Sequence, residues 1–460
     1  MQEATREGVR ARRAETLYRV LIFAVPAALF SALVWLFASG KNTLYVEALS
    51  YLGFSPYAFP FLDLHAILAA ADCHRLGIDV YLSNPCDVRG RPHVYSPLWL
   101  DLIPGFLSRD SVNQVGIVLD LMFIASLPLI MRPRSAWQCL LFIAATLSTT
   151  VIYALERANN DIVIFLLMVC AGALLAGPKR QRLAGYLIFL FAGLLKFYPL
   201  ALLVLMVRES WRRACAVVAI SAVAMLGLWW VHGRELALVL RHLPQTSYFA
   251  DSMSARNLPL GLMQLLPPMT PTFADWLAAV IFLILFAYSA MLVLKIFGAL
   301  ERHLIALEGW TRETAYLLIG AILLTGCFLT GENISYRGVL LLLVIPGLLQ
   351  FRRNAAVTGM RRLFGTGLTA VLGLLWEQCV GFALKHAFVT SATPDVPIWA
   401  LAVTEIYWLG RELLWWGTIS LFVALIIALF LRMPLVADLA LLLPKRNPSQ
   451  ATGVGVRRSK

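Results

Sequence analysis

Charged residues are scarce in this chain of 460 residues. Asp, Glu, Lys and Arg make up only 14% of it, whereas 60% of its residues are hydrophobic. A soluble domain is about a quarter charged and close to half apolar. The shortage of charge therefore excludes the soluble, disordered and fibrous classes. The apolar excess predicts an all-α fold, a polytopic transmembrane helical bundle.

Acidic residues are fewer than basic ones, 26 against 39, which gives a formal net charge of +13. In a membrane protein the excess of Lys and Arg gathers in cytoplasmic loops, so it indicates orientation and not a nucleic-acid partner. Metal-ligand spacing is also lacking, because His232, His242 and His303 stand isolated. The sequence therefore points to no metal site and no cofactor.

Long apolar runs mark the expected membrane spans. The first, Val20–Ser39, follows an arginine-rich N-terminus that should stay in the cytoplasm. With it we predict ten full crossings, at residues 20–39, 111–131, 138–155, 161–177, 214–231, 276–297, 314–330, 337–350, 363–384 and 413–431.

These spans divide the chain into a cytoplasmic N-terminus (1–19), a transmembrane core (20–431) and a cytoplasmic tail (432–460). Two long outer loops, 40–110 and 232–275, interrupt the core. Long ordered loops on one side of a bundle usually carry the function. We therefore expect an inner (plasma) membrane protein whose active face is turned to the periplasm or the outside.

One apolar segment, Leu183–Val207, does not fit a simple crossing. Basic clusters flank it on both sides, and both favour the cytoplasm. The segment is too short to cross twice as helices. Either it is a re-entrant pair of half-helices that turns at residues 196–199, or it crosses once and the later topology inverts. We favour the re-entrant turn, because Pro199 disfavours helical backbone at Tyr198 and irregular backbone at membrane depth is tolerated only beside a cavity or other protein.

Cysteines are few as well, and five of the seven lie in or beside expected spans. Cys73 and Cys86 instead share the first outer loop, among polar residues. In an oxidising compartment a bond between them would contribute about 3 kcal/mol to stability. Two unrelated thiols are the alternative, and the shared loop and compartment favour the disulfide.

Asp63 is the first candidate for chemistry. It follows the first span within an aromatic and apolar stretch, Tyr57–His65. Partial desolvation of a carboxylate there suits a general base that acts on a hydroxyl. The alternative is structural, since an Asp after Pro60 and before an alanine-rich run is a good helix N-cap.

Short polar motifs then follow one another between the apolar runs. In order they are Gly77-Ile78-Asp79-Val80-Tyr81, Tyr95-Ser96-Pro97, Glu156-Arg157-Ala158-Asn159-Asn160-Asp161, Lys196-Phe197-Tyr198-Pro199, Arg256-Asn257-Leu258-Pro259 and Ser335-Tyr336-Arg337.

In their order and spacing, from residue 63 to about 350, these motifs resemble the polyprenyl-phosphate-sugar-dependent glycosyltransferases of the GT-C superfamily, most closely glycosyltransferase family 87. The chain departs from the family's pattern at Val80, where Pro is usual, at Pro259, and at Glu156-Arg157, which replaces the more frequent Gly-Gln. These departures bear on the sugar and the acceptor more than on the fold.

The resemblance implies a GT-C-type bundle and an inverting transfer from a polyprenyl-phosphate sugar donor, for example of a mannose-like sugar, to a hydroxyl of a glycolipid or glycan acceptor. Asp63 matches the position of the family's catalytic base. No nucleotide-sugar fold is visible, which also favours a lipid-borne donor. Membrane lipids are the remaining expected partners. The residues expected to bind the substrates are His65, Asp79, Tyr81, Tyr95, Asn160, Tyr198 and Asn257.

Basic side chains near the membrane are expected to bind the donor's phosphate, because unpaired charge at that depth is costly and usually functional. They are Arg157, Lys196, Arg256 and Arg337. Pairing with Glu156, Asp161, Asp120 or Glu332, or snorkelling to the interface, is the alternative for each of Arg157, Lys196 and Arg337. Asp120 and Glu377 are expected to be internal partners of buried cations.

A lipid or solute transporter or flippase is the rival class, since it would explain the spans and buried charges without chemistry. Many transporters contain internal repeats with paired broken helices near the membrane midplane. This sequence has no detectable repeat and only one such segment, so we favour the enzyme.

Overall fold

The computed structural model describes residues 2–242, 247–249, 252–303, 310–390 and 398–436. Its α-helices are α1 (Gln2–Ala38), α2 (Asn42–Ser50), α3 (Leu62–Arg75), α4 (Leu98–Leu102), α5 (Val112–Ile130), α6 (Ala136–Thr146), α7 (Thr149–Arg157), α8 (Asn160–Leu175), α9 (Lys179–Lys196), α10 (Trp211–Arg241), α11 (Asn257–Leu265), α12 (Pro271–His303), α13 (Arg312–Thr330), α14 (Leu341–Asn354), α15 (Thr358–Leu375), α16 (Glu377–Lys385) and α17 (Ile398–Phe430). Tighter or wider helical turns are η1 (Arg109–Ser111), η2 (Tyr198–Arg208), η4 (Ser335–Leu340) and η5 (His386–Thr390), and the short strands are β1 (Ser252–Met253) and β2 (Asn333–Ile334).

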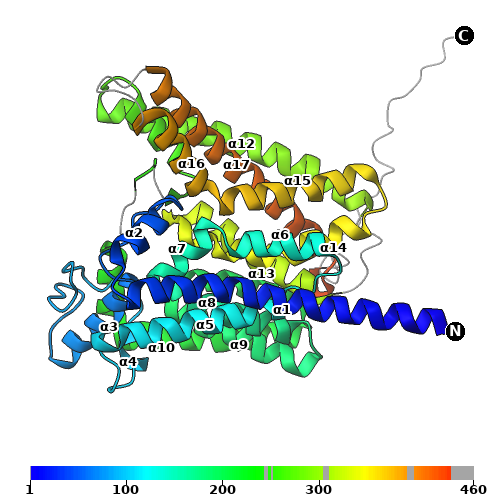
Figure 1. The fold of residues 1–460 in the computed structure, drawn as a ribbon, viewed down its shortest axis with the longest axis horizontal. Helices are drawn as coiled ribbons and strands as arrows, with labels where there is room; N and C mark the ends of the chain where they lie inside the picture. Colours follow the sequence, from blue (N-terminus) through cyan, green and yellow to red (C-terminus); the bar gives the residue numbers. More distant parts are fainter. Residues whose placement is uncertain (1, 243–246, 250–251, 304–309, 391–397, 437–460) are drawn as a thin grey trace, which may run out of the picture.

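The helices form an elongated bundle with the N-terminus at one end and the loops around α3 and α4 at the other (Figure 1). α13 and α14 pack against each other in the centre and are almost wholly buried. α8 packs on α9 and on α5, and α12 packs on α17, so these pairs flank the centre. The predicted all-α polytopic bundle is confirmed.

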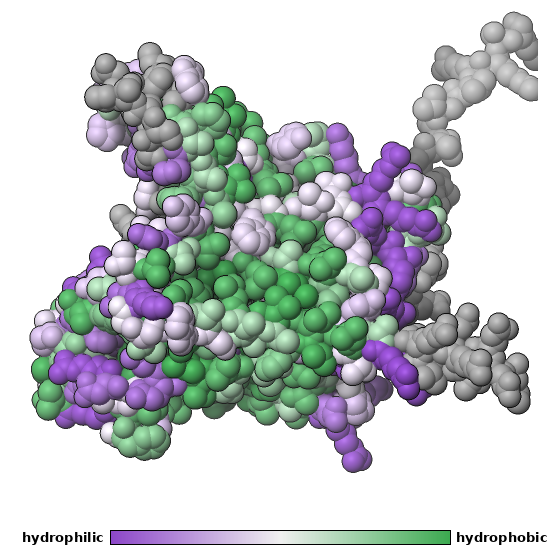
Figure 2. Space-filling view, in the orientation of Figure 1, coloured by the Kyte–Doolittle hydropathy of each residue, from purple (hydrophilic) through white to green (hydrophobic). Residues whose placement is uncertain are grey.

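Apolar side chains cover the middle of the molecule, and hydrophilic residues gather towards its two ends (Figure 2). Trp229, Trp230 and Leu294 are among many large apolar side chains that are more than half exposed. Such a surface is stable in lipid and not in water. The band therefore marks the part of the bundle that faces the membrane.

The prediction of ten crossings is too high. Within the described residues six helices are long and apolar enough to cross a membrane, or eight if each of two bent pairs counts as one span. The bent pairs are α6 with α7, at 47°, and α15 with α16 and η5, at 58°. The expected spans at 161–177 and 337–350 became α8 and α14, helices of 16 and 14 residues. Their apolar sequence reflects burial inside the bundle, since at 1.5 Å per residue they are about 24 Å and 21 Å long, less than the hydrocarbon core.

The chain reversal expected at residues 196–199 is confirmed. α9 ends at Lys196, Phe197 adopts φ 59° and ψ −51°, and η2 then runs back along α9. The Tyr186 hydroxyl donates to the Leu205 carbonyl at 3.0 Å, and Arg182 Nη1 lies 3.1 Å from Glu209 Oε1. Both arms therefore begin and end at the same end of the bundle, which a single crossing would not allow.

In their described residues, the two predicted outer loops are more helical than expected. Residues 40–110 contain α2, α3, α4 and the start of η1. In the second region, 232–275, α10 continues to Arg241, α11 spans Asn257–Leu265 and α12 already begins at Pro271. The prediction placed helices only at long runs without charged residues. Helix turns that extend beyond such a run were therefore assigned to loops. The expected tail, 432–460, lies largely outside the described residues.

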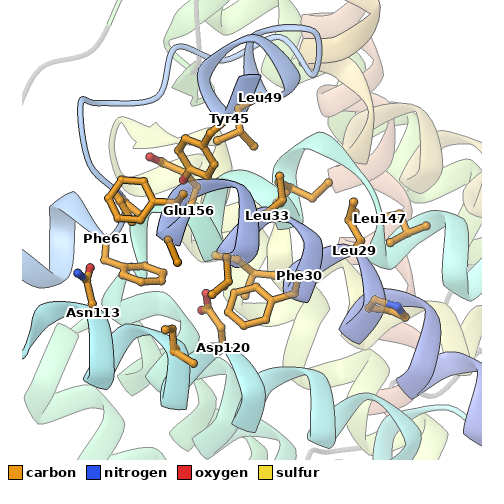
Figure 3. A pocket seen from close by; sticks show the side chains of 18 of the residues that line it. Leu29, Phe30, Leu33, Tyr45, Leu49, Phe61, Asn113, Asp120, Leu147 and Glu156 are labelled. Atoms are coloured by element: carbon orange, nitrogen blue, oxygen red, sulfur yellow. The ribbon is translucent and has the colours of Figure 1, made fainter. Parts of the chain in front are cut away.

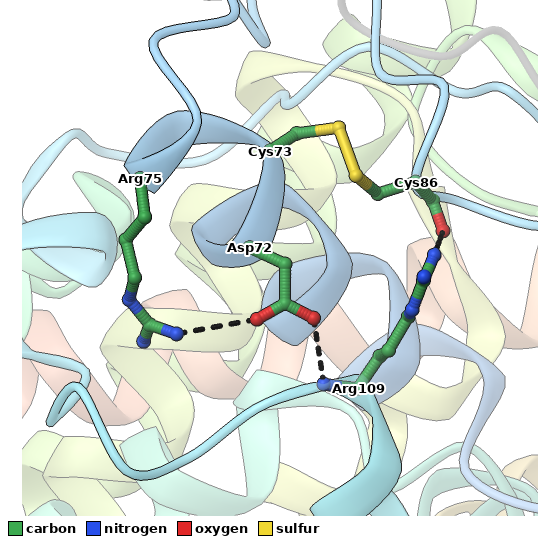
Figure 4. The surroundings of a disulfide bond; sticks show 5 residues. All are labelled: Asp72, Cys73, Arg75, Cys86 and Arg109. Atoms are coloured by element: carbon green, nitrogen blue, oxygen red, sulfur yellow. Dashed lines mark hydrogen bonds and ion pairs between the residues drawn. A yellow bond between two sulfur atoms is a disulfide. The ribbon is translucent and has the colours of Figure 1, made fainter.

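The disulfide between Cys73 and Cys86 is present, with Cα atoms 5.9 Å apart. It joins the end of α3 to the following loop (Figure 4). Beside it, Asp72 accepts hydrogen bonds from Arg75 Nη1 at 3.2 Å and from the Arg109 backbone N–H at 3.0 Å. These bonds fix the outer segment around α3, on which Asp63 lies.

Candidate active site

Three strained backbone positions come together around Asp63. Among the described non-glycine residues, positive φ occurs at Phe61 (66°), Ala158 (41°) and Phe197 (59°). Such conformations cost about 1–3 kcal/mol each and cluster at functional sites. Phe61 precedes the first turn of α3, Ala158 lies between α7 and α8, and Phe197 lies at the α9–η2 turn. The Phe61 N–H donates to the Glu156 carbonyl at 2.6 Å, so the first two turns are joined directly.

Asp63 is buried in the first turn of α3, with 8% of its surface exposed. Its Oδ2 accepts a hydrogen bond from Asn159 Nδ2 at 2.7 Å, and Arg91 Nη1 lies 3.6 Å from its Oδ1. The helix N-cap is Phe61, so the alternative role of Asp63 as N-cap is wrong. The side chain points away from its own helix to a partner 96 positions along the chain.

A second carboxylate, Asp161, holds the basic residues that the sequence singled out. Lys196 Nζ lies 2.8 Å from Asp161 Oδ1, and Arg337 Nε lies 3.4 Å from Asp161 Oδ2. The Tyr198 hydroxyl donates to Asp161 Oδ1 at 2.7 Å, and the Arg337 guanidinium lies 4.9 Å from the centre of the Tyr198 ring. Lys196 and Arg337 therefore do pair with an acidic residue, as the alternative interpretation proposed, but both cations share the single carboxylate of Asp161.

Two asparagines connect Asp63 to this cluster. Lys196 Nζ donates to Asn159 Oδ1 at 3.2 Å and to Asn160 Oδ1, while Asn159 Nδ2 donates to Asp63. Asn159 is also the N-cap of α8, because its Oδ1 accepts from the Asp161 N–H at 2.9 Å. The predicted residues Asp63, Asn160, Lys196, Tyr198 and Arg337 therefore belong to one connected network.

The outer loop closes the network from another side. Arg91 donates to Asp87 through Nε at 3.0 Å and Nη2 at 3.1 Å, and His65 Nδ1 lies 3.5 Å from Asp87. Burial alone would raise the pKa of Asp87, but the hydrogen bonds from His65 and Arg91 outweigh it and hold that pKa well below its usual value. His65, expected to bind substrate, thus positions the loop that brings Arg91 to Asp63.

Tyr95 and Tyr81, also expected to bind substrate, pack on either side of His93. The centroid of the His93 ring lies 5.3 Å from that of Tyr81 and 5.7 Å from that of Tyr95. Lys196 Nζ lies 5.7 Å from the Tyr95 ring centre, so Tyr95 borders the network. Burial lowers the pKa of His93 to about 4, which keeps its imidazole neutral at pH 7.

Four other expected residues are not joined to the network by any bond among the described side chains. Asp79 closes its own turn by accepting from the Tyr81 N–H and pairs with Arg234 at 2.7 Å. Arg256 is exposed at the start of α11. Asn257 is buried and accepts from the Ser252 hydroxyl at 3.0 Å. Arg157 lies 3.1 Å from Glu156, the pairing that was its alternative.

We did not predict Asn159, Arg91 or Asp87 as site residues, and Asp161 was expected only as a counter-ion. A signal for Asn159 existed, because the polar run from Glu156 to Asp161 stands between two apolar helices. Arg91 and Asp87 gave no such signal. They lie in a polar loop, and their role depends on how that loop folds back over α3.

An apolar groove of about 180 Å³ lies beside the network, between α1, α2, α5 and the α6–α7 bend (Figure 3). Leu29, Phe30 and Leu33 of α1 line it, and Phe61 and Glu156 close one end near Asp63. Asp120 also lines it, is fully buried and has no hydrogen-bond partner among the described residues. The expectation that Asp120 pairs with a buried cation is therefore wrong.

The sequence model of glycosyltransferase family 87 matches residues 97–319. This segment includes Asn159, Asn160, Asp161, Lys196 and Tyr198, whereas Asp63 precedes it and Arg337 follows it. No curated protein and no solved structure matches the chain. The resemblance found in the motifs is confirmed: residues 97–319 match glycosyltransferase family 87, and this match implies a membrane glycosyltransferase.

Proposed function

We propose that the protein transfers a sugar, for example a mannose-like one, from a polyprenyl-phosphate donor to a hydroxyl of a glycolipid or glycan acceptor at the outer face of the inner membrane. Asp63 is the general base. It takes the proton of the acceptor hydroxyl while the hydroxyl oxygen bonds to the sugar's anomeric carbon. The bond from that carbon to the phosphate oxygen breaks, and the electron pair leaves with the polyprenyl phosphate.

The observation that carries the proposal is the network that joins Asp63 to Lys196 and Arg337 through two asparagines. The Asn159 amide and Arg91 contact the two oxygens of Asp63 and orient its carboxylate. Lys196 and Arg337 lie close enough together to share one carboxylate. A departing phosphate is stabilised by positive charge of this kind.

The groove beside the network supports a lipid-borne donor. Its walls are aliphatic and aromatic side chains of α1, α2 and α5, and its closed end lies at Phe61, two positions before Asp63. A prenyl chain gains favourable free energy from such a surface, at about 25 cal/mol per Å² of apolar area. We propose that the prenyl chain of the donor occupies the groove while its phosphate lies by Lys196 and Arg337.

The experiment that tests this function uses the purified full chain in lipid nanodiscs with a radiolabelled polyprenyl-phosphate mannose. Asp63→Asn should bind the donor and lower transfer by about 10²- to 10⁴-fold, because Asn keeps the hydrogen-bonding shape but accepts no proton. His74→Gln, at an exposed residue of the same helix, is the matched control and should keep wild-type transfer.

Lys196→Gln and Arg337→Gln should instead weaken donor binding, since each removes a phosphate-binding charge. Transfer by Asp63→Asn at the wild-type rate would contradict the assignment of the base. Donor binding that is unaffected by both charge removals would contradict the assignment of the phosphate site.

A further inference from the structure

A second pocket lies on the opposite side of α7 from the apolar groove. It has a volume of about 740 Å³, within the range of small-molecule sites. Ile152 and Leu155 of α7 line the groove, whereas Tyr153 between them lines this pocket. α7 is therefore the wall between the two spaces, and its last residues carry the polar run of the candidate active site.

The lining of this pocket combines aromatic rings with hydrogen-bonding side chains. Its aromatic members come from five separate segments, and the polar ones come mainly from α16 and α17. This mixture suits a sugar, whose C–H faces pack on aromatic rings while its hydroxyls need donors and acceptors. The residues that the argument uses are Ser55, Tyr153, Gln378, Thr404, Tyr407 and Trp408.

Gln378 offers this pocket an unused hydrogen-bond acceptor. Its Nε2 donates to the Ser335 hydroxyl, while its buried Oε1 has no hydrogen-bond partner within the described parts of the chain. A buried amide oxygen without a partner costs about 1–3 kcal/mol, which a ligand hydroxyl could recover.

The charged residues that line the pocket are of both signs, Glu377, Lys385 and Arg411. Arg411, which lines it, has its Nε 3.0 Å from Glu412 Oε1, and Glu377 lies in the same wall. A neutral polyol fits this mixed lining, because Glu377 opposes an added anion and Arg411 is already paired with Glu412.

Short contacts lead from the pocket to the catalytic network. The ring centroid of Tyr153 lies 5.6 Å from that of Tyr336, which precedes Arg337, and Arg157 lies over the same Tyr153 ring at 5.2 Å. Ser335, the partner of Gln378, begins that same segment. Tyr153, Tyr336 and Arg157 therefore border both spaces, and the reacting hydroxyl of an acceptor held in this pocket would extend past them towards Asp63.

We propose that this pocket binds the acceptor as a hydroxyl-bearing glycoside. The inference rests on the proposed function, and it deepens it by separating the acceptor from the donor across α7. α16 and α17 lie beyond the segment that matches the family, so the acceptor site is built largely from residues outside that match.

The test measures binding of methyl glycosides of mannose, glucose and galactose to the full chain in nanodiscs by saturation-transfer NMR, without any donor. Ser55→Trp and Thr404→Trp fill the pocket from two sides. Each should raise the Kd of the glycoside about tenfold or more, because the larger side chain occupies space that the sugar needs. Thr369→Trp, at an exposed threonine of α15, is the matched control and should bind like the wild type.

In transfer assays the two pocket-filling variants should raise KM for the acceptor and leave KM for the donor unchanged. The proposal is overturned if no glycoside binds to the wild type, or if the pocket-filling variants bind as the control does. Glycoside binding that is lost in those variants, without any transfer from the polyprenyl-phosphate donor, would uphold the pocket and overturn the proposed donor instead.

Discussion

Single residues in this protein take their roles from their partners and not from their type. Asp63 has an amide and a distant guanidinium, Asp161 has two close cations and a phenol, and Asp120 has no hydrogen-bond partner among the described residues. We propose Asp63 as the base because Asp161 is held by two cations and Asp120 lines the apolar groove. The same residue type therefore occurs as the proposed base, as a partner of two cations and as a buried group of the apolar groove.

Asp161→Asn should destabilise the protein by about 3–5 kcal/mol, because it leaves two buried cations without their shared anion. The measurement is thermal unfolding in nanodiscs. Adding undecaprenyl phosphate should stabilise this variant more than the wild type, since the lipid's phosphate replaces the missing charge.

The double variant Asp161→Asn, Lys196→Met provides the control for that experiment. It removes one of the two stranded cations and should recover part of the lost stability. An Asp161→Asn protein as stable as the wild type would mean that the ion pairs do not hold this site together.

His93 should make the outer loop sensitive to acid. The pKa of its imidazole is lowered from 6.5 to about 4 by burial, so the unfolded chain binds the proton more readily. Stability is therefore complete above pH 6.5 and falls by about 3 kcal/mol as the pH drops to 4. The depressed pKa of Asp87 acts only below this range, where protonation of the carboxylate would remove its contribution.

Unfolding midpoints measured between pH 4 and pH 7 should show this slope in the wild type and lose it in His93→Gln. His242→Gln removes an exposed histidine at the end of α10 and should keep the slope. If the slope persists in His93→Gln, another group controls the acid response.

At the scale of elements, the re-entrant α9–η2 hairpin depends on close packing at Gly193. A Cβ added there would lie 2.5 Å from Leu200 Cδ2 and 3.1 Å from the Leu200 backbone nitrogen. Gly193→Ala should therefore cost about 1–3 kcal/mol and lower transfer, because the displaced turn carries Lys196. Thermal unfolding and the transfer assay measure the two effects.

Gly227 in α10 is the matched control, since an added Cβ there meets nothing within 4 Å. Gly227→Ala should be neutral or stabilising, by about 0.5–1 kcal/mol for a helix interior. Equal behaviour of the two variants would show that the hairpin tolerates a wider spacing.

The features that could be predicted from the sequence were those that depend on a few neighbouring residues. The turn at residues 196–199 followed from flanking charge and Pro199, and the disulfide followed from two cysteines in one oxidised loop. The lengths of α8 and α14 were not predictable, because a helix buried in protein and one facing lipid can have the same apolar sequence. Asn160, Lys196 and Arg337 were found from motifs, whereas Arg91 required the fold of the loop over Asp63.

At the scale of the whole molecule, the two ends of the bundle indicate how it is oriented in the membrane. The disulfide, α3 and the candidate active site lie at the end opposite the N-terminus (Figure 1). The end of α14 carries Arg352 and Arg353 and the start of α15 carries Arg361 and Arg362, which the positive-inside rule assigns to the cytoplasm. A lipid-borne donor would then meet the site only from the outer leaflet.

This orientation can be measured with single cysteines in a chain whose free cysteines have been replaced and whose Cys73–Cys86 bond is kept. Phe106 is 81% exposed in the loop after α4, and Gly359 at the start of α15 has open space for a side chain. Phe106→Cys should react with a membrane-impermeant maleimide in intact cells, because it lies on the same side as the disulfide. Gly359→Cys should react only after the membrane is permeabilised, because the arginines around it favour the cytoplasmic side by the positive-inside rule. The reverse pattern would place Asp63 on the cytoplasmic side, where a disulfide does not persist, and would remove the basis for an outer-face donor.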